Sequence, residues 1–199
     1  MQRTLVLFVR APQLGAGKRR LAREIGAVAA LRFERIMVAR LLRGFAPDRR
    51  WRLRLAVTPD MARHRAQFWH PAIAAVGQGS GDLGIRMCRA LRTCPPGPAV
   101  LVGADIPALA TRHVWAAFRV LGSHDLAFGP AEDGGFWLVG ARHPRHLPTL
   151  FNGVRWSGPY ALADTLASLP RRMTVGLAER LEDVDDADAY RRLLPHRGF

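Results

Sequence analysis

Residues 125–141, DLAFGPAEDGGFWLVGA, place two short apolar runs on either side of a polar turn. Each run, DLAFGP at 125–130 and FWLVGA at 136–141, has the length and composition of a buried strand. Between the runs come Glu132, Asp133, Gly134 and Gly135, and an Asp-Gly pair in this setting is a strong signal for a β-hairpin. The stretch therefore predicts two adjacent antiparallel strands with two carboxylates at their turn.

Around this hairpin, apolar runs alternate with segments whose apolar residues recur at helical spacing. The predicted strands are 4–9, 51–58, 73–78, 98–105, 125–130, 136–141 and 172–177. The predicted helices are 19–45, 59–69, 81–92, 108–121, 158–169 and 186–194. Such alternation predicts an α/β fold, with a mostly parallel sheet between two layers of helices and the hairpin as its antiparallel exception. Since no repeat or linker interrupts the chain, we expect one domain over residues 1–199.

The chain is strongly basic, and the distribution of its cations decides what this implies. Its 199 residues include 30 Lys and Arg against 16 Asp and Glu, a formal net charge of +14. Such a balance favours an anionic partner, which can be nucleic acid, a membrane surface or a phosphorylated small molecule. However, Lys18 is the only lysine and the arginines are scattered along predicted helices, as codon bias in a GC-rich genome produces. Most arginines are therefore expected to form a solvated surface.

Signals for targeting, membrane insertion and disulfide formation are weak. Two cysteines, Cys88 and Cys94, make neither a disulfide framework nor a zinc site. The N-terminal apolar run is followed by RAPQLGAGK rather than by a small-residue cleavage site, so no signal peptide is expected. No apolar run approaches transmembrane length. We expect a soluble, cytoplasmic protein that does not bind membranes.

The loop after the first predicted strand has the composition of a phosphate-binding loop. In RAPQLGAGKRRLA, Gly15 and Gly17 allow a sharp turn and a close approach of the backbone to a ligand. Lys18 and Arg20 then open a helix, whose N-terminal amides favour an anion. The loop matches neither the Walker A pattern nor GxGxxG. A simple connection between strand and helix is the alternative.

Acidic residues follow two other predicted strands. Asp105 ends the run 98–105, where it can cap the next helix or hold a hard divalent cation together with phosphate oxygens. Asp183 and Asp185 follow the run 172–177, in LEDVDDADAY. Ligands of open α/β sheets bind beyond the carboxyl ends of the strands, so these acids are candidates for a ligand site.

Six segments together carry a resemblance to a known family. RAPQLGAGKRRLA, GQGSGDLGIRM, VGADIPAL, GPAEDGGFWLVGA, LFNGVRWS and LEDVDDADAY occur in this order, and over nearly the whole chain they resemble the DUF2064 family. That family is glycosyltransferase-like, or nucleotide-diphospho-sugar transferase-like, and is similar to enzymes of the GT-A fold and more remotely to guanylyltransferases. The resemblance implies a GT-A fold, a first loop that wraps nucleotide phosphates, and one divalent metal, Mg²⁺ or Mn²⁺, shared by two acids.

Carried over by position, the resemblance implies a set of site residues. The metal ligands are Asp105 and Asp185. The residues expected at the nucleotide and its phosphates are Arg10, Ala11, Gly15, Lys18, Arg20, Gln78, Gly79, Gly81 and Asp82. Those expected at the substrate are Gly134, Gly135 and Trp156, and catalytic roles fall to Asp133 and Asp105. Arg10 and Arg19 stand where the family pattern has Lys and Thr.

Asp133 has three candidate roles. It can act as a general base on an acceptor hydroxyl, or it can orient a sugar hydroxyl. Alternatively, Asp133, Gly134 and Gly135 form only a hairpin turn. With the other motifs present we prefer a functional role, in which the two glycines keep the turn free of side chains so that a substrate can approach the backbone.

Three functions remain open at this point. The first is a metal-dependent transferase that uses a nucleotide sugar as donor and a small molecule as acceptor. The second is a nucleotidyltransferase that joins a nucleoside triphosphate to a phosphorylated small molecule. The third is a basic nucleic-acid-binding module, which the absence of a nucleic-acid motif and the position of the acids disfavour. We therefore expect nucleotide and acceptor as partners, no nucleic acid, and a homodimer as one candidate assembly.

Overall fold

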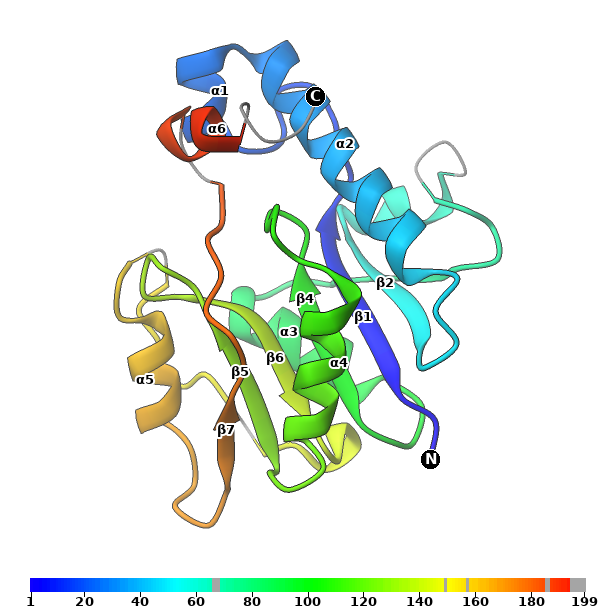
Figure 1. Cartoon of the computed structure of the whole chain (residues 1–199), viewed down its shortest axis with the longest axis vertical. Helices are drawn as coiled ribbons and strands as arrows, with labels where there is room; N and C mark the ends of the chain where they lie inside the picture. The colour runs from blue at the N-terminus through cyan, green and yellow to red at the C-terminus, as the bar shows by residue number, and fades with distance from the viewer. Residues whose placement is uncertain (66–68, 149, 157, 185–186, 194–199) are drawn as a thin grey trace.

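One mixed sheet runs through the fold, and helices lie on both of its faces (Figure 1). The computed structural model describes residues 1–65, 69–148, 150–156, 158–184 and 187–193. Its strands are β1 (Thr4–Arg10), β2 (Arg52–Thr58), β3 (Ala74–Gly77), β4 (Ala99–Gly103), β5 (Leu126–Pro130), β6 (Phe136–Ala141) and β7 (Val175–Leu177). Its α-helices are α1 (Arg19–Ile25), α2 (Ala27–Phe45), α3 (Leu83–Arg92), α4 (Thr111–Val120), α5 (Ala161–Ala167) and α6 (Ala187–Leu193). Short 3₁₀ helices are η1 (Asp60–His64) and η2 (Pro144–His146).

The strand order explains why one edge of the sheet collects the candidate residues. The seven strands lie in the order β3-β2-β1-β4-β6-β5-β7. Neighbours pair in parallel except at β6, which pairs antiparallel with both β4 and β5. The predicted hairpin and the mostly parallel, mixed sheet are thus confirmed. Because β5 runs in the same direction as β4, the turn between β5 and β6 lies at the edge where β1 and β4 end.

The two faces of the sheet bury separate apolar clusters, which makes three layers. On one face α2 and α4 pack through residues such as Leu41 and Phe118 against alternate side chains of β1. On the other face α3 and α5 pack against β4 and β6 through residues such as Leu91 and Ala161. This two-sided burial confirms the predicted α/β/α architecture.

A third, smaller cluster lies beyond the carboxyl end of β1. Leu21 of α1, Phe33 and Met37 of α2, and Val184 and Ala189 near the C-terminus pack together there. In Figure 1, α1 and α6 lie side by side at the end of α2. The cluster brings the C-terminal segment over the first loop, which matters for the site described below.

Two predicted helices differ from the structure. The segment 19–45 is broken at Gly26, whose φ of 88° and ψ of 149° cannot continue a helix. The described part of the segment 59–69 is only the 3₁₀ helix η1. There the carbonyl of Ala62 accepts the Arg65 amide at 3.1 Å and the Trp69 indole N–H at 2.8 Å, so it serves a short turn and a side chain rather than an α-helical bond.

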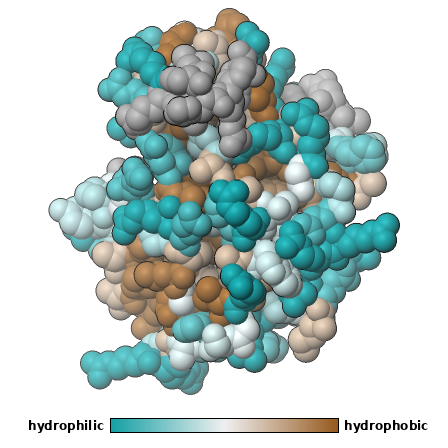
Figure 2. Space-filling model, viewed as in Figure 1, coloured by the Kyte–Doolittle hydropathy of each residue, from teal (hydrophilic) through white to brown (hydrophobic). Residues whose placement is uncertain are grey.

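Two further features of the structure are the polarity of its surface and the lengths of its helices. On the face seen in Figure 2, hydrophilic and hydrophobic residues are interspersed over the elements of Figure 1. Within the described residues, every helix is too short or too polar to cross a bilayer.

Candidate functional site

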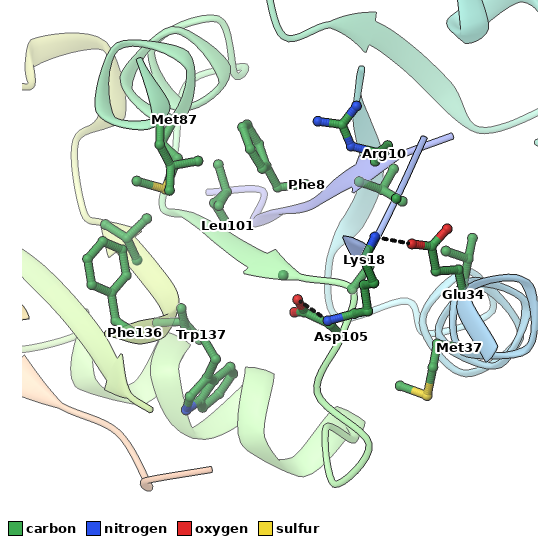
Figure 3. A pocket seen from close by; sticks show the side chains of 18 of the residues that line it. Phe8, Arg10, Lys18, Glu34, Met37, Met87, Leu101, Asp105, Phe136 and Trp137 are labelled. Atoms are coloured by element: carbon green, nitrogen blue, oxygen red, sulfur yellow. Dashed lines mark hydrogen bonds and ion pairs between the residues drawn. The ribbon is translucent and has the colours of Figure 1, made fainter. Parts of the chain in front are cut away.

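An ion pair at the carboxyl edge of the sheet joins three distant segments. Lys18, in the loop after β1, donates from Nζ to Asp105 Oδ2 at 3.1 Å and to the carbonyl of Val184. Asp105 follows β4, and Val184 belongs to the segment between β7 and α6. The Lys18 side chain is 12% exposed, so its ammonium group is largely withdrawn from water and lies between two oxygen atoms. Figure 3 shows the contact with Asp105.

Glu34 of α2 completes this arrangement, and the sequence analysis did not identify it. Its Oε1 accepts the backbone N–H of Lys18 at 3.0 Å. Partial burial raises the pKa of Glu34, against the opposing effects of that hydrogen bond and of the charges of Lys18 and Arg10. A Cβ at Gly17 would lie 1.8 Å from Glu34 Oε1, so any other residue there would displace the Glu34 carboxylate. One feature of the sequence could have pointed to this residue: Glu34 is the single acidic residue of α2.

A cavity with a volume of about 320 Å³, called the first cavity, opens beside this cluster. Its charged lining consists of Arg10, Lys18, Glu34 and Asp105. The remaining wall is apolar, and Figure 3 shows Met87 and Phe136 across the cavity from Lys18, with Met37 beside Glu34 on α2. The apolar lining includes Phe8, Met37, Leu83, Met87, Leu101, Phe136 and Trp137. A ligand that combines a flat apolar part with anionic groups fits such a cavity.

The second cavity adjoins the first and has a volume of about 240 Å³. The two cavities share Asp105 and part of the apolar wall. The second cavity adds Asp133, Gly135, Trp156 and Asp183 to its lining. Thus four of the predicted site residues, Asp105, Asp133, Gly135 and Trp156, come together around one space.

The turn between β5 and β6 presents Asp133 to this second cavity. Its Oδ1 accepts the backbone N–H of Gly135 at 2.8 Å, which fixes the carboxylate within the turn. Gly134 has a φ of 84°, and a Cβ there would lie 2.2 Å from the carbonyl oxygen of Pro159. The lack of a side chain at Gly134 is therefore explained by packing, whereas Gly135 lines the cavity itself.

Trp156 belongs to an aromatic group on the α3 and α5 side of the sheet. Its ring lies 6.3 Å from that of Phe136 and 5.7 Å from that of Phe151, measured between centroids. Phe136 and Phe151 stack at 6.0 Å. These contacts hold Trp156 half-buried at the wall of the second cavity.

The residues of the loop 78–82 that were expected to contact the nucleotide instead form hydrogen bonds within the protein. Gln78 is 1% exposed, and its side-chain N–H groups donate to the carbonyls of Val9 at 3.1 Å and Ala56 at 2.9 Å. Its Oε1 accepts from Arg86 at 3.1 Å. The Gln78 amide is thus used within the fold, and Gln78 lines neither cavity.

The remainder of that loop is similarly constrained. Gly79 and Gly81 have φ values of 74° and 108°, which favour glycine. The Gly79 amide donates to Asp60 Oδ1 at 3.0 Å. Asp82 caps α3 by accepting the Ile85 amide at 2.8 Å, a structural role typical of an N-terminal cap.

Arg86 is a second residue that the sequence analysis missed. Burial lowers the pKa of its guanidinium, and the nearby charge of Arg10 adds to the effect. The guanidinium carbon lies 5.8 Å from the centroid of the Phe8 ring, a first-cavity residue. In the described part of the chain, no hydrogen-bond partner reaches the buried Nε of Arg86. Arg86 itself lines neither cavity.

Gly134 and the predicted residues of the loop 78–82 line neither cavity, and three further predicted residues also lie away from both. Ala11 is fully buried, and its amide donates to the Thr58 carbonyl at 2.8 Å, extending the β1–β2 pairing. Gly15, with a φ of 73°, lines a separate hollow beside Gly17 and Glu34. Arg20 is exposed on α1 and, unlike Arg10 and Lys18, lines neither cavity.

The implied divalent metal can be tested against the oxygen atoms at this edge. The described residues contain no group of three His, Cys, Asp or Glu side chains arranged for a metal, and Asp185 lies outside the described residues. However, the Asp105 carboxylate and the Val184 carbonyl already converge on one cation, the Lys18 ammonium. Mg²⁺ in phosphate sites takes one or two carboxylates plus phosphate oxygens, so these residues fit a metal that arrives with a phosphorylated ligand.

Solved structures of other proteins share this fold. A candidate nucleotide-diphospho-sugar transferase from Desulfovibrio desulfuricans G20 is 29% identical, with a TM-score of 0.89 over 98% of this chain and 87% of that chain. 4-Diphosphocytidyl-2C-methyl-D-erythritol synthase from Anaerococcus prevotii DSM 20548 is 9% identical, with a TM-score of 0.61 over 98% and 99%. Rv0371c from Mycobacterium tuberculosis H37Rv, in complex with manganese, is 20% identical, with a TM-score of 0.56 over 99% and 100%.

Comparisons at the level of sequence give a family but no characterised relative. No curated protein sequence matches the chain. The model of one family, described as uncharacterized proteins conserved in bacteria, matches residues 41–158. That range covers more than half of the chain and includes β4, Asp105, the loop 78–82 and the whole hairpin. The chain belongs to the DUF2064 family.

Proposed function

We propose that this protein is a transferase that moves a group, most simply a sugar, from a nucleotide-activated donor to a small acceptor. The observation that carries the proposal is the meeting of the two cavities at Asp105. The first cavity combines Arg10 and Lys18 with two carboxylates, whereas the charged residues that line the second are all carboxylates. The fold supports the same conclusion, since nucleotide-dependent transferases are among its neighbours.

The donor would bind in the first cavity. Its anionic phosphates would lie near Arg10 and Lys18, the two cations that line the first cavity. Charge-assisted hydrogen bonds to phosphate are among the strongest polar contacts in proteins. The apolar wall around Phe8 and Met87 would cover the flat or apolar part of the donor.

Asp105, together with Asp185 and the Val184 carbonyl, would hold a divalent metal against the donor phosphates. A bound metal of this kind supplies charge stabilisation as the nucleotide leaves, and manganese is present in the Rv0371c structure. In the structure, Lys18 contacts the Asp105 carboxylate and the Val184 carbonyl. Its flexible side chain would then turn to the phosphates, where its charge is again neutralised.

Asp133 would act on the acceptor. It faces the second cavity from a fixed turn, and one carboxylate oxygen is engaged by the Gly135 amide. The other oxygen can accept the proton of an acceptor hydroxyl as that hydroxyl attacks the donor. Gly135 leaves room beside Asp133 for the approaching group.

Nucleotidyl transfer is the second candidate. The 4-diphosphocytidyl-2C-methyl-D-erythritol synthase of A. prevotii has the same fold over nearly its whole length. Such a reaction needs the same phosphate-binding and metal-binding groups, but it differs in the bond that breaks and in the acceptor that attacks.

The first prediction concerns Asp105. The change Asp105→Asn removes the charge that faces Lys18, and we expect it to raise the Kd of an Mn²⁺–nucleotide complex by about tenfold or more. Isothermal titration calorimetry with nucleoside diphosphates and nucleotide sugars measures the effect. The matched control is Asp48→Asn, which removes an acid paired with Arg50 at 2.6 Å, in the loop before β2. Equal Kd values for the parent and Asp105→Asn would exclude Asp105 from the site.

The second prediction concerns Asp133. The change Asp133→Asn keeps an oxygen for the Gly135 amide but cannot take a proton. We expect donor affinity to remain while turnover falls by about a hundredfold or more. The control is Glu132→Gln at the same exposed turn, outside both cavities, which should keep most of its turnover. Normal turnover of Asp133→Asn with saturating acceptor would mean that this turn serves only the hairpin.

The third prediction concerns Glu34 and pH. Because burial raises its pKa in the folded state, the folded protein holds a proton on Glu34 that the unfolded chain releases more readily. The resulting stabilisation is present below the unfolded pKa and is lost as pH rises through the folded pKa. Relative to the parent, Glu34→Gln should therefore gain free energy of unfolding between about pH 4 and about pH 7.

Urea unfolding at both pH values measures this difference, and the same pair of measurements on Glu132→Gln provides the baseline. A relative stability of Glu34→Gln that falls over this interval would mean that the charged form of Glu34, paired with Lys18 and Arg10, is the favoured one.

A further inference from the structure

The second cavity combines its carboxylates with a wall of large apolar side chains, three of them aromatic. That wall consists of Leu83, Met87, Ile106, Phe136, Trp137 and Trp156. Trp137 is buried in β6, and its indole N–H donates to the carbonyl of Glu179 at 3.0 Å. Trp156, in contrast, is half-buried and belongs to the connection between η2 and α5. The position of one large part of the wall therefore depends on how this connection packs.

Helix α3 comes very close to the connection at Gly84. A Cβ at Gly84 would lie 2.6 Å from the Cβ of Phe151 and 2.9 Å from Cζ2 of Trp156. The Cβ of Phe151 is bonded directly to its backbone, so a change of rotamer cannot relieve the first of these contacts. Gly84 lies within a helix, where alanine is more favourable than glycine. The close approach of Phe151 and Trp156 therefore explains why this helical position has no side chain.

The backbone of Phe151 is held in a conformation that a bulky residue rarely adopts. Its φ is 70°, and it is the one non-glycine residue with a positive φ in the described part of the chain. Such a conformation persists where the surrounding contacts determine it. The ring of Phe151 is 5% exposed and stacks on that of Phe136 at 6.0 Å between centroids. Phe151 thus fixes the start of the connection against α3 and β6.

Arg155 fixes the same connection on the side of α5. Its backbone N–H and its Nε donate to Asp164 Oδ2 at 3.0 Å and 2.8 Å, and its second guanidinium nitrogen donates to Oδ1 at 2.8 Å. The hydrogen bond from the Arg155 side chain lowers the pKa of Asp164 to about 2. The guanidinium carbon also lies 4.0 Å from the centroid of the Tyr160 ring. Trp156, the next residue, is therefore placed by contacts to two helices.

We propose that Gly84 determines acceptor specificity by setting the position of Trp156, and that the acceptor is a hydroxyl compound with a flat apolar face, such as that of a sugar ring. This inference rests on the proposed function and specifies its acceptor. The flat face packs on Trp156 while a hydroxyl reaches Asp133, which lines the same cavity. Aromatic walls bind the apolar part of a ligand, and a few polar groups fix its orientation. A short flexible alcohol has no such face.

Substitution of Gly84 tests the packing, and Gly44 provides a matched control. Gly44 is exposed in the last turn of α2, where an added Cβ meets nothing within 4 Å. Since alanine is the better helix former, Gly44→Ala should raise the melting temperature by about 1–2 °C. Gly84→Ala should instead lower it by about 4 °C or more, because the new methyl group overpacks the contact. A rise for Gly84→Ala like that for Gly44→Ala would overturn the proposal.

The variant Phe151→Gly distinguishes this contact from a general defect of α3. Glycine at position 151 removes the Cβ nearest to Gly84 and suits the positive φ. In this background, Gly84→Ala should lower the melting temperature clearly less than it does in the parent. An equal cost in both backgrounds would assign the defect to α3 itself and would contradict the proposal.

Acrylamide quenching shows whether Trp156 moves when position 84 changes. The contribution of Trp156 to the fluorescence is the difference between each protein and its Trp156→Phe counterpart. This contribution should be more accessible to acrylamide in Gly84→Ala than in the parent, and unchanged in Gly44→Ala. Equal accessibility in all three proteins would mean that Gly84 does not set the position of Trp156.

Shielding of Trp156 from acrylamide then tests the class of acceptor. The full chain, with Mg²⁺ and GDP or UDP, is titrated with phenyl β-D-glucoside, which has flat apolar faces and free hydroxyls, or with glycerol. The glucoside should shield Trp156 in the parent and in Gly44→Ala but less in Gly84→Ala, whereas glycerol should not. Absence of shielding by the glucoside, or equal shielding by glycerol, would overturn the proposed acceptor.

Failure of the proposed function is a separate outcome. If no nucleotide or nucleotide sugar raises the melting temperature in the presence of Mg²⁺ or Mn²⁺, the assignment as a nucleotide-dependent transferase is wrong. The melting and quenching measurements on the Gly84 and Phe151 variants need no ligand, so they decide the packing of Trp156 independently.

Discussion

The contact of Lys18 with Asp105 and the Val184 carbonyl joins the parts of the chain that build the site. It connects the loop after β1, the end of β4 and the segment before α6, which lie far apart along the chain: Lys18 and Asp105 are separated by 87 residues, and Lys18 and Val184 by 166. Glu34 adds α2 by holding the Lys18 amide. A withdrawn ammonium group requires nearby oxygens, and the same oxygens suit a divalent metal. The interaction that orders the free protein thus also prepares the place where a metal and phosphates would bind.

The position of the hairpin follows from the single reversed strand. Because β6 runs antiparallel between β4 and β5, its turn with β5 comes back to the edge where β4 ends. Asp133 and Asp105 consequently line one cavity although they come from different loops. In a fully parallel sheet a crossover connection would separate them. The reversal therefore explains why two acids and two glycines occur between buried strands in a cationic chain.

Much of the fold was predictable from periodicity, because each strand and most helices are short, regular and bounded by Gly, Pro or Asp. Lys18, Asp105 and Asp133 were predictable for a related reason, since each follows a buried strand and ligands bind at that end of the sheet.

The contributions of Glu34 and Arg86 were not predictable, because both residues lie within amphipathic helices, where a single charged side chain is usually a solvated one. Their importance depends on tertiary contacts with Lys18 and Gln78. Gln78 itself was expected to contact the nucleotide, but its amide is engaged by Val9, Ala56 and Arg86, a set of contacts that no local pattern encodes.

The central claim is that Asp105 and the β5–β6 turn border one nucleotide site at the carboxyl edge of the sheet. Paramagnetic broadening tests it directly, with ¹⁵N-labelled protein and substoichiometric Mn²⁺ added together with a nucleoside diphosphate. The account predicts that the amides of residues 103–105 and 133–135 broaden first, while those at the start of β1 and β2, at the opposite edge, remain sharp. Broadening centred on the opposite edge, or on scattered surface acids with no preference for Asp105, would contradict it.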